Sequence, residues 1–180
     1  ESAQAGGLIG RSEGSTLENI TTNLDFNGQT TSGSYFSYGG VVGFATTSTP
    51  SGRGTFPTRL INIQASGDVE GYAYVGGLVG QGIYTQIEDS SFIGNLTTYS
   101  IRAGGLAGSL ANSGVFRSSV RNSMVSGNII SNVLSTSSLI GGVVGNMTYG
   151  EIENVTFTGA IDATNMSSVG GIVGSYVGDN

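Results

Sequence analysis

Short apolar runs separated by glycine, asparagine, aspartate and serine repeat along the whole chain. Six times a glycine pair precedes two aliphatic or small apolar residues and a third glycine. These copies start at Gly6, Gly39, Gly76, Gly104, Gly141 and Gly170, which lie 33, 37, 28, 37 and 29 residues apart. Self-similarity with a period of about 20 to 50 residues is typical of solenoids, whose units bury their apolar faces against their neighbours. We therefore expect one solenoid segment over residues 1–180.

A second pattern follows the glycine pairs. An aliphatic residue is followed two positions later by Asn or Asp and, five residues further on, by Gly and more alternation. The four clear copies are Leu60, Asn62, Gly67 and Val69; Ile87, Asp89, Gly94 and Leu96; Val120, Asn122, Gly127 and Ile129; and Ile152, Asn154, Gly159 and Ile161. The first copy begins at Leu17 but reaches a glycine only at Gly28, so it either carries an insertion or pairs differently.

Each repeat offers three apolar stretches that are too short for helices and rich in β-branched residues, which predicts three strands per unit. Three strands and three corners in about 30 residues match one coil of a parallel β-helix. The predicted fold is therefore all-β: a right-handed parallel β-helix (β-solenoid) of about five coils with three parallel sheets. A bend at each glycine pair would let the chain change face, so both aliphatic positions after the pair are predicted core residues.

Two coils carry extra residues at the same corner. Residues 46–57 and 109–116 are expected to protrude from one side of the solenoid, where loops on a rigid scaffold commonly bind ligands. Candidate binding residues are the arginines in or just after these insertions and aromatic residues suited to stacking on a sugar or a protein. They are Arg53, Arg59, Arg117, Arg121, Tyr72 and Tyr74, with Tyr35, Phe36, Tyr38 and Tyr99 nearby. A solvated loop is the simpler alternative for the arginines.

Composition narrows the class of protein. The chain has 32 glycines without a Gly-X-Y period, which excludes collagen. Six arginines, no lysine and a net charge of −6 disfavour nucleic acid and anionic lipid as partners. The absence of cysteine and histidine excludes disulfides and histidine-ligated metals, and no apolar run of about 18 residues predicts membrane insertion. A polar, lysine-free β-repeat is common among secreted proteins, so we expect an extracellular or cell-surface location.

The sequence contains few residues in patterns typical of catalysis or cofactor binding. The calcium β-roll pattern, the Walker pattern and a helix-opening GxGxxG are missing, so no cofactor is expected. Glu151 and Glu153 share one face of a predicted strand and are expected to face solvent. Asn146 and Asn165 begin Asn-x-Ser/Thr sequons in predicted loops and are candidate glycosylation sites. Asn154 lies in the repeated Asn position and is expected to be a corner residue bonded to the backbone.

The run Val75–Gly80, followed by Ile87-Glu88-Asp89-Ser90 and Gly94, resembles the GLUG-type repeat, and Val169–Gly174 is similar to its first half. The resemblance covers nearly the whole chain. It implies a right-handed β-helix from a bacterial surface adhesin of the filamentous-haemagglutinin type, or the non-catalytic stalk of an IgA-specific metalloprotease. The zinc motif of that protease needs histidine, which this chain lacks.

These observations favour a non-enzymatic structural or adhesive segment that acts as a rigid spacer. The expected partners are further coils of the same or an identical chain stacked end to end, because both ends stop at a repeat motif without a polar cap. A host glycan or protein is the expected partner of the insertions. The alternative is a fragment of a polysaccharide-cleaving β-helix, which would require two or three carboxylates converging in one groove.

Overall fold

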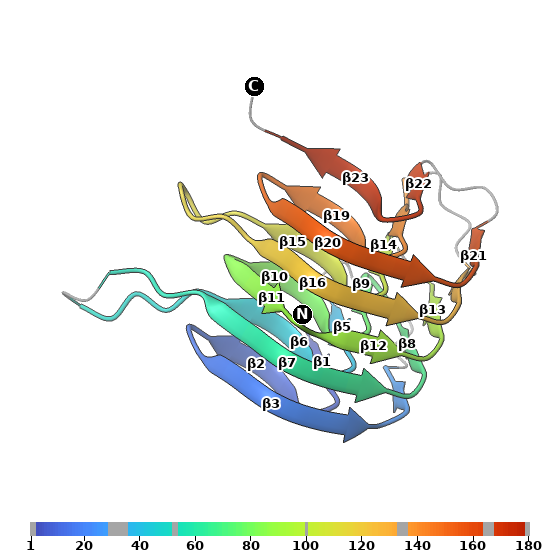
Figure 1. Cartoon of the computed structure of the whole chain (residues 1–180), viewed down its shortest axis with the longest axis horizontal. Helices are drawn as coiled ribbons and strands as arrows, with labels where there is room; N and C mark the ends of the chain where they lie inside the picture. Colours follow the sequence, from blue (N-terminus) through green and yellow to red (C-terminus); the bar gives the residue numbers. More distant parts are fainter. Residues whose placement is uncertain are drawn as a thin grey trace.

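The computed structural model describes residues 3–28, 36–51, 54–99, 101–132, 137–163 and 168–178. In these residues the chain winds into a stack of β-strand coils that contains no helix (Figure 1). The coils follow the sequence, from β3 at one end of the stack to β23 at the other. Strands from successive coils pair in parallel, for example β3 with β7 and β16 with β20. The predicted all-β parallel β-helix is confirmed.

Four sheets, here named A to D in the order in which a coil visits them, form the walls. Sheet A contains β1 (Gln4–Gly6), β5 (Ser37–Gly39), β9 (Tyr74–Gly76), β14 (Arg102–Gly104), β18 (Leu139–Gly141) and β22 (Ser168–Gly170). Sheet B contains β2 (Ile9–Glu13), β6 (Val42–Thr46), β10 (Val79–Ile83), β15 (Ala107–Ala111), β19 (Val144–Thr148) and β23 (Val173–Val177). Sheet C contains β3 (Thr16–Asn23), β7 (Thr58–Ser66), β11 (Thr85–Glu88), β12 (Ser91–Ile93), β16 (Ser119–Ser126) and β20 (Glu151–Thr158). Sheet D contains β4 (Phe26–Asn27), β8 (Val69–Gly71), β13 (Leu96–Thr98), β17 (Ile129–Ser131) and β21 (Ile161–Ala163).

The glycine pairs explain why a coil has four walls where the sequence predicts three. Each pair bends the chain sharply between sheets A and B, so one predicted strand becomes two. A Cβ added to Gly76 would lie 2.1 Å from the carbonyl oxygen of Val79, and one added to Gly77 would lie 2.3 Å from that of Gly105. Only glycine fits a bend with backbone this close on both sides. The predicted bend is therefore present, and it separates two sheets.

The core is a set of inward ladders. Val41, Val42, Leu78 and Val79 are fully buried, so both aliphatic positions after the glycine pair point inward in the central coils as predicted. The same residue types align from coil to coil, as in the ladder Leu17, Leu60, Ile87, Val120 and Ile152 of sheet C. Because each coil buries its apolar side chains against the next one, the stability of a coil depends on its neighbours.

The first copy of the second pattern keeps the common register. Leu17 pairs with Leu60 and Asn23 with Ser66, so the copy carries no insertion. Leu24 occupies the position of the corner glycine Gly67, and the backbone N–H of Leu24 donates to Ser66. A Cβ at Gly67 would lie 2.3 Å from the carbonyl oxygen of Leu24 in the preceding coil. Leu24 belongs to the first coil, where the described residues place no backbone below it, so glycine is not required there.

The end coils expose apolar side chains that are buried elsewhere. Leu8 is 49% exposed although its counterpart Val41 is fully buried. At the other end, Tyr176 is 55% exposed although Met147, its partner in the register of sheet B, is fully buried. The position of a residue along the stack, rather than its type, decides its burial.

Candidate functional site

Two loops leave the stack at the corner between sheets B and C, on the side opposite β21 (Figure 1). Residues 47–57 connect β6 to β7, and residues 112–118 connect β15 to β16. Each loop is closed by an antiparallel bridge between a serine and a phenylalanine, Ser48 with Phe56 and Ser113 with Phe116. The predicted common corner is confirmed. The predicted start of the second insertion is wrong, because Ser109 pairs within β15 and is buried.

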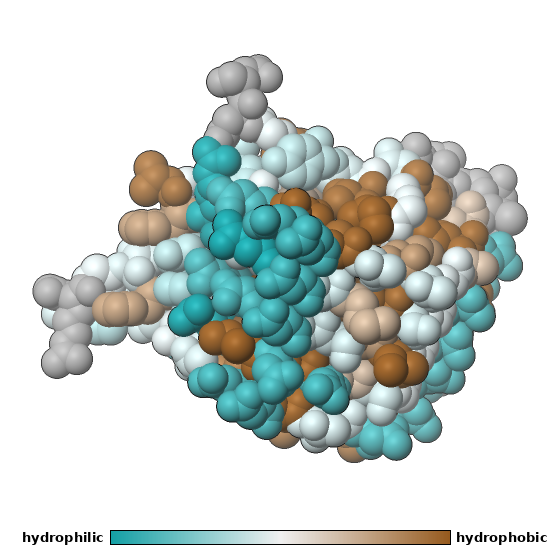
Figure 2. Space-filling view, viewed as in Figure 1, coloured by the Kyte–Doolittle hydropathy of each residue, from teal (hydrophilic) through white to brown (hydrophobic). Residues whose placement is uncertain are grey.

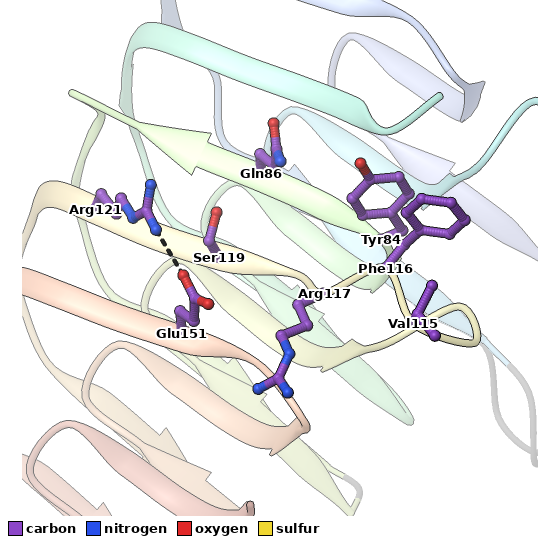
Figure 3. Close-up of a pocket in the computed structure, with 8 residues that line it drawn as sticks. All are labelled: Tyr84, Gln86, Val115, Phe116, Arg117, Ser119, Arg121 and Glu151. Atoms are coloured by element: carbon purple, nitrogen blue, oxygen red, sulfur yellow. Dashed lines mark hydrogen bonds and ion pairs between the residues drawn. The ribbon is translucent and has the colours of Figure 1, made fainter. Parts of the chain in front are cut away.

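A hollow of about 280 Å³ lies beside the second loop (Figure 3). It is lined by Tyr84, Gln86, Val115, Phe116, Arg117, Ser119, Arg121 and Glu151. Three of these residues occupy the same position in successive coils of sheet C, since Gln86 pairs with Ser119 and Ser119 with Glu151. The hollow therefore spans three coils, or about 10 Å at the usual spacing between strands. The loop provides one wall and the outward face of sheet C provides the other.

An aromatic pair forms the loop side of the hollow. The rings of Tyr84 and Phe116 are stacked with their centroids 5.0 Å apart and an interplanar angle of 23°. Tyr84 closes the same corner in the preceding coil and has a positive φ of 48°. The two rings therefore come from adjacent coils, and they meet because residues 112–118 fold back over the shorter corner. Phe116 keeps 38% of its surface exposed beside the hollow.

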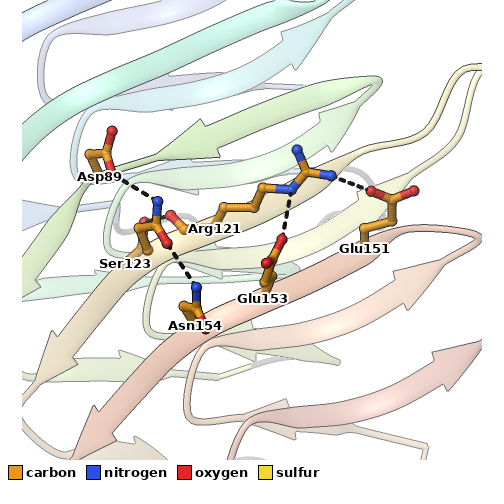
Figure 4. Close-up of polar contacts among 7 residues, drawn as sticks. Asp89, Arg121, Ser123, Glu151, Glu153 and Asn154 are labelled. Atoms are coloured by element: carbon orange, nitrogen blue, oxygen red, sulfur yellow. Dashed lines mark hydrogen bonds and ion pairs between the residues drawn. The ribbon is translucent and has the colours of Figure 1, made fainter.

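Charged side chains form the opposite side. Arg121 Nη2 lies 2.5 Å from Glu151 Oε2, and Arg121 Nε lies 3.5 Å from Glu153 Oε2 (Figure 4). Arg59, two coils earlier, lies 3.5 Å from Glu88 through Nη2. In Figure 2 hydrophilic side chains form a band across the middle of this face, with hydrophobic groups beside it. The hollow thus places an aromatic pair opposite a guanidinium–carboxylate pair.

The repeated Asn/Asp position lies in a bend inside sheet C. All five members have positive φ values between 49° and 57°, and they are Asn19, Asn62, Asp89, Asn122 and Asn154. Side-chain hydrogen bonds join three of the four neighbouring pairs: Asn62 donates to Asn19 at 2.8 Å, Asn122 to Asp89 at 3.1 Å and Asn154 to Asn122 at 3.2 Å (Figure 4). The expectation that Asn154 is a corner residue bonded to the backbone is therefore wrong. Asparagine tolerates the left-handed conformation and can both donate and accept, which suits a ladder.

The structure separates the other predicted binding residues. Tyr72 stacks on Tyr99, with ring centroids 5.2 Å apart, where the chain leaves sheet D. Tyr74 is buried with Phe36 and Tyr38, and its hydroxyl accepts a hydrogen bond from Arg102 Nη1 at 3.3 Å. These residues line no part of the hollow. Arg53 and Tyr35 lie outside the described residues.

In the stacked pair of Tyr72 and Tyr99, the pKa of Tyr99 is raised. A hydrogen bond to the Glu70 carboxylate raises the pKa of Tyr99 above its ordinary value of 10.0, and burial and the negative charge of Glu70 act in the same direction. Asn27 Nδ2 also donates to Glu70, at 3.0 Å. Because a raised pKa favours the neutral phenol, Tyr99 remains protonated and continues to donate to Glu70 at neutral pH.

Of the two glycosylation candidates, the structure describes only Asn146. Asn146 lies within β19 and is 9% exposed, so the predicted loop position is wrong. Its side-chain amide points toward Ser109 and Thr148, with donor–acceptor distances of 3.5 Å. A sequon inside a packed strand offers no access to a glycosylating enzyme. Asn165 lies outside the described residues.

Sequence reasoning identified Arg117, Arg121 and the second insertion but missed Tyr84, Gln86, Ser119 and Glu151. The sequence does contain a signal for three of them. Each of these residues directly precedes the first aliphatic residue of the second pattern, and they are Gln86, Ser119 and Glu151. Aligning the polar positions of the repeats, as well as the apolar ones, places these side chains in one row.

Among the described residues, no group of three or more His, Cys, Asp or Glu side chains is placed to hold a metal ion. Within the same ranges, no helix is long and apolar enough to cross a membrane.

Comparison with known proteins identifies the repeat. The GLUG motif family matches residues 71–97 and 136–162. Each match spans one glycine pair and the bend in sheet C that follows it, at Asp89 and Asn154 respectively. No curated protein and no solved structure matches the chain. The chain therefore contains two recognisable GLUG motifs, and the structure shows that each follows one coil of the β-helix.

Proposed function

We propose that this chain is a non-enzymatic structural and adhesive segment of an extracellular surface or fibre protein. It acts as a rigid spacer and presents a contact site at the corner between sheets B and C. The observation that carries the proposal is that this corner varies while the coils stay in register. Residues 47–57 and 112–118 interrupt the chain there, yet β7 and β16 both keep their pairing with β11. Loops that vary on an invariant frame are typical of binding scaffolds.

The GLUG motif supports the surface context. The resemblance implies an adhesin or the non-catalytic stalk of a surface protease, and in either role the coils extend a protein away from its anchor. Exposed apolar residues at both ends, including Leu8 and Tyr176, support stacking on further coils of the same or an identical chain. The proposed partners are therefore neighbouring coils at the ends and a ligand at the side.

The rival function is polysaccharide cleavage by a β-helical enzyme. Glycoside hydrolysis commonly uses two carboxyl groups that face each other across the scissile bond, about 5 to 10 Å apart. Here Glu151 and Glu153 both pair with Arg121, and Glu88 pairs with Arg59. Each of these carboxylates therefore has an arginine as its ion-pair partner, which differs from two carboxyl groups that face each other across a bond to be cleaved. This arrangement supports binding over turnover.

The test combines a binding assay with a turnover assay. The purified chain is applied to an array of glycans and extracellular proteins, and incubated with the same polysaccharides while reducing ends are measured. In the variant, the Tyr-Gly pair that closes this corner at Tyr149 and Gly150 replaces residues 112–118. The control carries the same replacement of residues 47–57. We expect binding without new reducing ends, lost in the variant and kept in the control, with circular dichroism showing both to be folded.

Release of reducing ends would contradict the non-enzymatic function. Binding that survives removal of both insertions would contradict the placement of the contact site. Binding to nothing on the array would contradict the adhesive part of the proposal.

A further inference from the structure

We infer that the hollow beside the second insertion binds a neutral oligosaccharide. This inference rests on the proposed function and names the ligand class of its contact site. The site is the set of side chains around Phe116, Gln86, Ser119, Arg121 and Glu151.

The size of the hollow favours a small-molecule ligand, such as one or two sugar rings, over a segment of a protein partner. A volume of about 280 Å³ lies near the lower end of the range for small-molecule pockets, about 300 to 1,000 Å³. A stable protein partner would instead need to bury on the order of 1,000 Å² or more. The length of the hollow, about two strand spacings, allows one sugar ring to lie against the aromatic pair and a second to continue along sheet C.

The chemistry of the two sides matches the two faces of a pyranose. A sugar ring has an apolar face of C–H groups, and the exposed part of Phe116 offers it a flat surface whose orientation is fixed by stacking on Tyr84. The hydroxyls at the ring edge both donate and accept hydrogen bonds. Arg121 supplies donors and Glu151 supplies acceptors only 2.5 Å away, so the pair is suited to adjacent hydroxyls.

Gln86 and Ser119 extend the polar side in the register of sheet C. An amide and a hydroxyl each offer a donor and an acceptor, which again suits hydroxyls better than a group of one charge. Ser119 is largely covered by its surroundings, so it contributes to the floor of the hollow.

The charge balance selects a neutral sugar over a sulfated or uronic one. Arg117, Arg121 and Glu151 line the hollow, and Glu153 lies 3.5 Å from Arg121, so two negative charges accompany the two positive ones. The net charge of the whole chain is −6. A polyanion would therefore gain no long-range attraction and would have to displace Glu151 from Arg121.

The experiment measures affinity with defined oligosaccharides. Neutral hexose and N-acetylhexosamine oligosaccharides, with sulfated and uronic oligosaccharides as comparators, are titrated into the purified chain up to about 10 mM and followed by calorimetry. We expect binding by neutral members. Phe116→Ala should weaken it about tenfold, equivalent to 1.4 kcal/mol, and Glu151→Gln should also weaken it because the acceptor charge is lost.

Phe56→Ala is the matched control. Phe56 holds the bridging position of the first insertion, as Phe116 does in the second, and it is similarly exposed. Its replacement should leave the affinity unchanged. Amide chemical shifts that move at Gln86 and Ser119 on titration locate the ligand even if Phe116→Ala is poorly folded.

Three results would overturn the inference: binding of only sulfated or uronic oligosaccharides, equal losses in Phe116→Ala and Phe56→Ala, or no binding of any neutral oligosaccharide. If the chain instead binds an extracellular protein through residues 112–118, the ligand class is wrong and the adhesive function stands. If reducing ends appear, the proposed function itself fails.

Discussion

The corner between sheets B and C varies in length from coil to coil, whereas the corner between sheets C and D is constant in length. Between sheets C and D, the corners at residues 67–68, 94–95, 127–128 and 159–160 all contain two residues. Between sheets B and C, the connections are 14–15, 47–57, residue 84, 112–118 and 149–150. The first corner is invariant in length, whereas the second varies more than tenfold. A solenoid can vary in this way only if its register is fixed elsewhere.

The invariant corner fixes the register through close backbone contact. A Cβ at Gly127 would lie 1.9 Å from the carbonyl oxygen of Gly94, the equivalent residue one coil earlier. Asn95 Oδ1 accepts the backbone N–H of Asn128 at 3.2 Å, and Asn128 Oδ1 accepts that of Ala160 at 3.0 Å. Each coil is therefore held at one height by the coil before it. At the variable corner Gly14 also lies close to Ser48, but an added Cβ at Gly54 or Gly114 would meet nothing within 4 Å. The close contact is therefore not repeated from coil to coil there, and this corner can carry Phe116 and the hollow.

The largest effect is expected from placing a charge in the wall. Leu78 is fully buried, and Leu78→Asp would bury a carboxylate without a partner, which should cost more than about 4 kcal/mol and unfold several coils. Val115 lies in the second insertion and is 85% exposed, so Val115→Asp should change stability by less than about 0.5 kcal/mol. Chemical denaturation followed by circular dichroism measures both. Comparable losses would mean that the insertion is part of the structural frame.

A glycine in each corner tests the comparison more finely. Gly127 has φ of +145° and touches backbone, so Gly127→Ala should destabilise the chain by about 3 kcal/mol. Gly114 has φ of +59°, but an added Cβ would meet nothing within 4 Å. Gly114→Ala should therefore cost only about 1 kcal/mol, the price of the left-handed conformation. The midpoints of urea unfolding provide the measurement, and a larger loss at Gly114 would reverse the assignment of the two corners.

The sequence predicts the frame better than the site, for a physical reason. Backbone contact restricts the identity of residues such as Gly76 and Gly127 in every coil, so the period and the register are visible as repeated letters. The bend at each glycine pair was predicted, but its division of one strand into sheets A and B was not, because the geometry of the bend depends on how closely neighbouring coils approach. The parallel β-helix was therefore predictable, whereas the number of walls was not.

The site depends on contacts that do not repeat. Tyr84 and Phe116 lie in one connection each, and their stacking follows from the path of residues 112–118. Arg117 was predicted from its nearness to that insertion, but the partners of Arg121 on the next coil required the register of sheet C. The loop position predicted for Asn146 was wrong because a three-residue sequon carries no information about burial. Structural features that recur in every coil can be predicted from a single sequence, whereas contacts that occur at one place in the stack cannot.

The smallest effect concerns a gap in the asparagine ladder. Asn62 donates to Asn19 at 2.8 Å, but the carboxylate of Asp89 is an acceptor only, so it has no proton to donate to Asn62. Asp89→Asn restores a donor at a position whose φ of 51° suits asparagine, and should raise the free energy of unfolding by about 0.5 to 1 kcal/mol.

The control is Asp68→Asn at the invariant corner. There Oδ1 already accepts the backbone N–H of Asn95 at 2.8 Å, and the amide oxygen of an asparagine would accept it in the same way. Urea denaturation at neutral pH compares the two variants. A gain at Asp89 without one at Asp68 would show that the bend in sheet C also helps to fix the register, whereas equal stabilities would leave that role to the glycine corner alone.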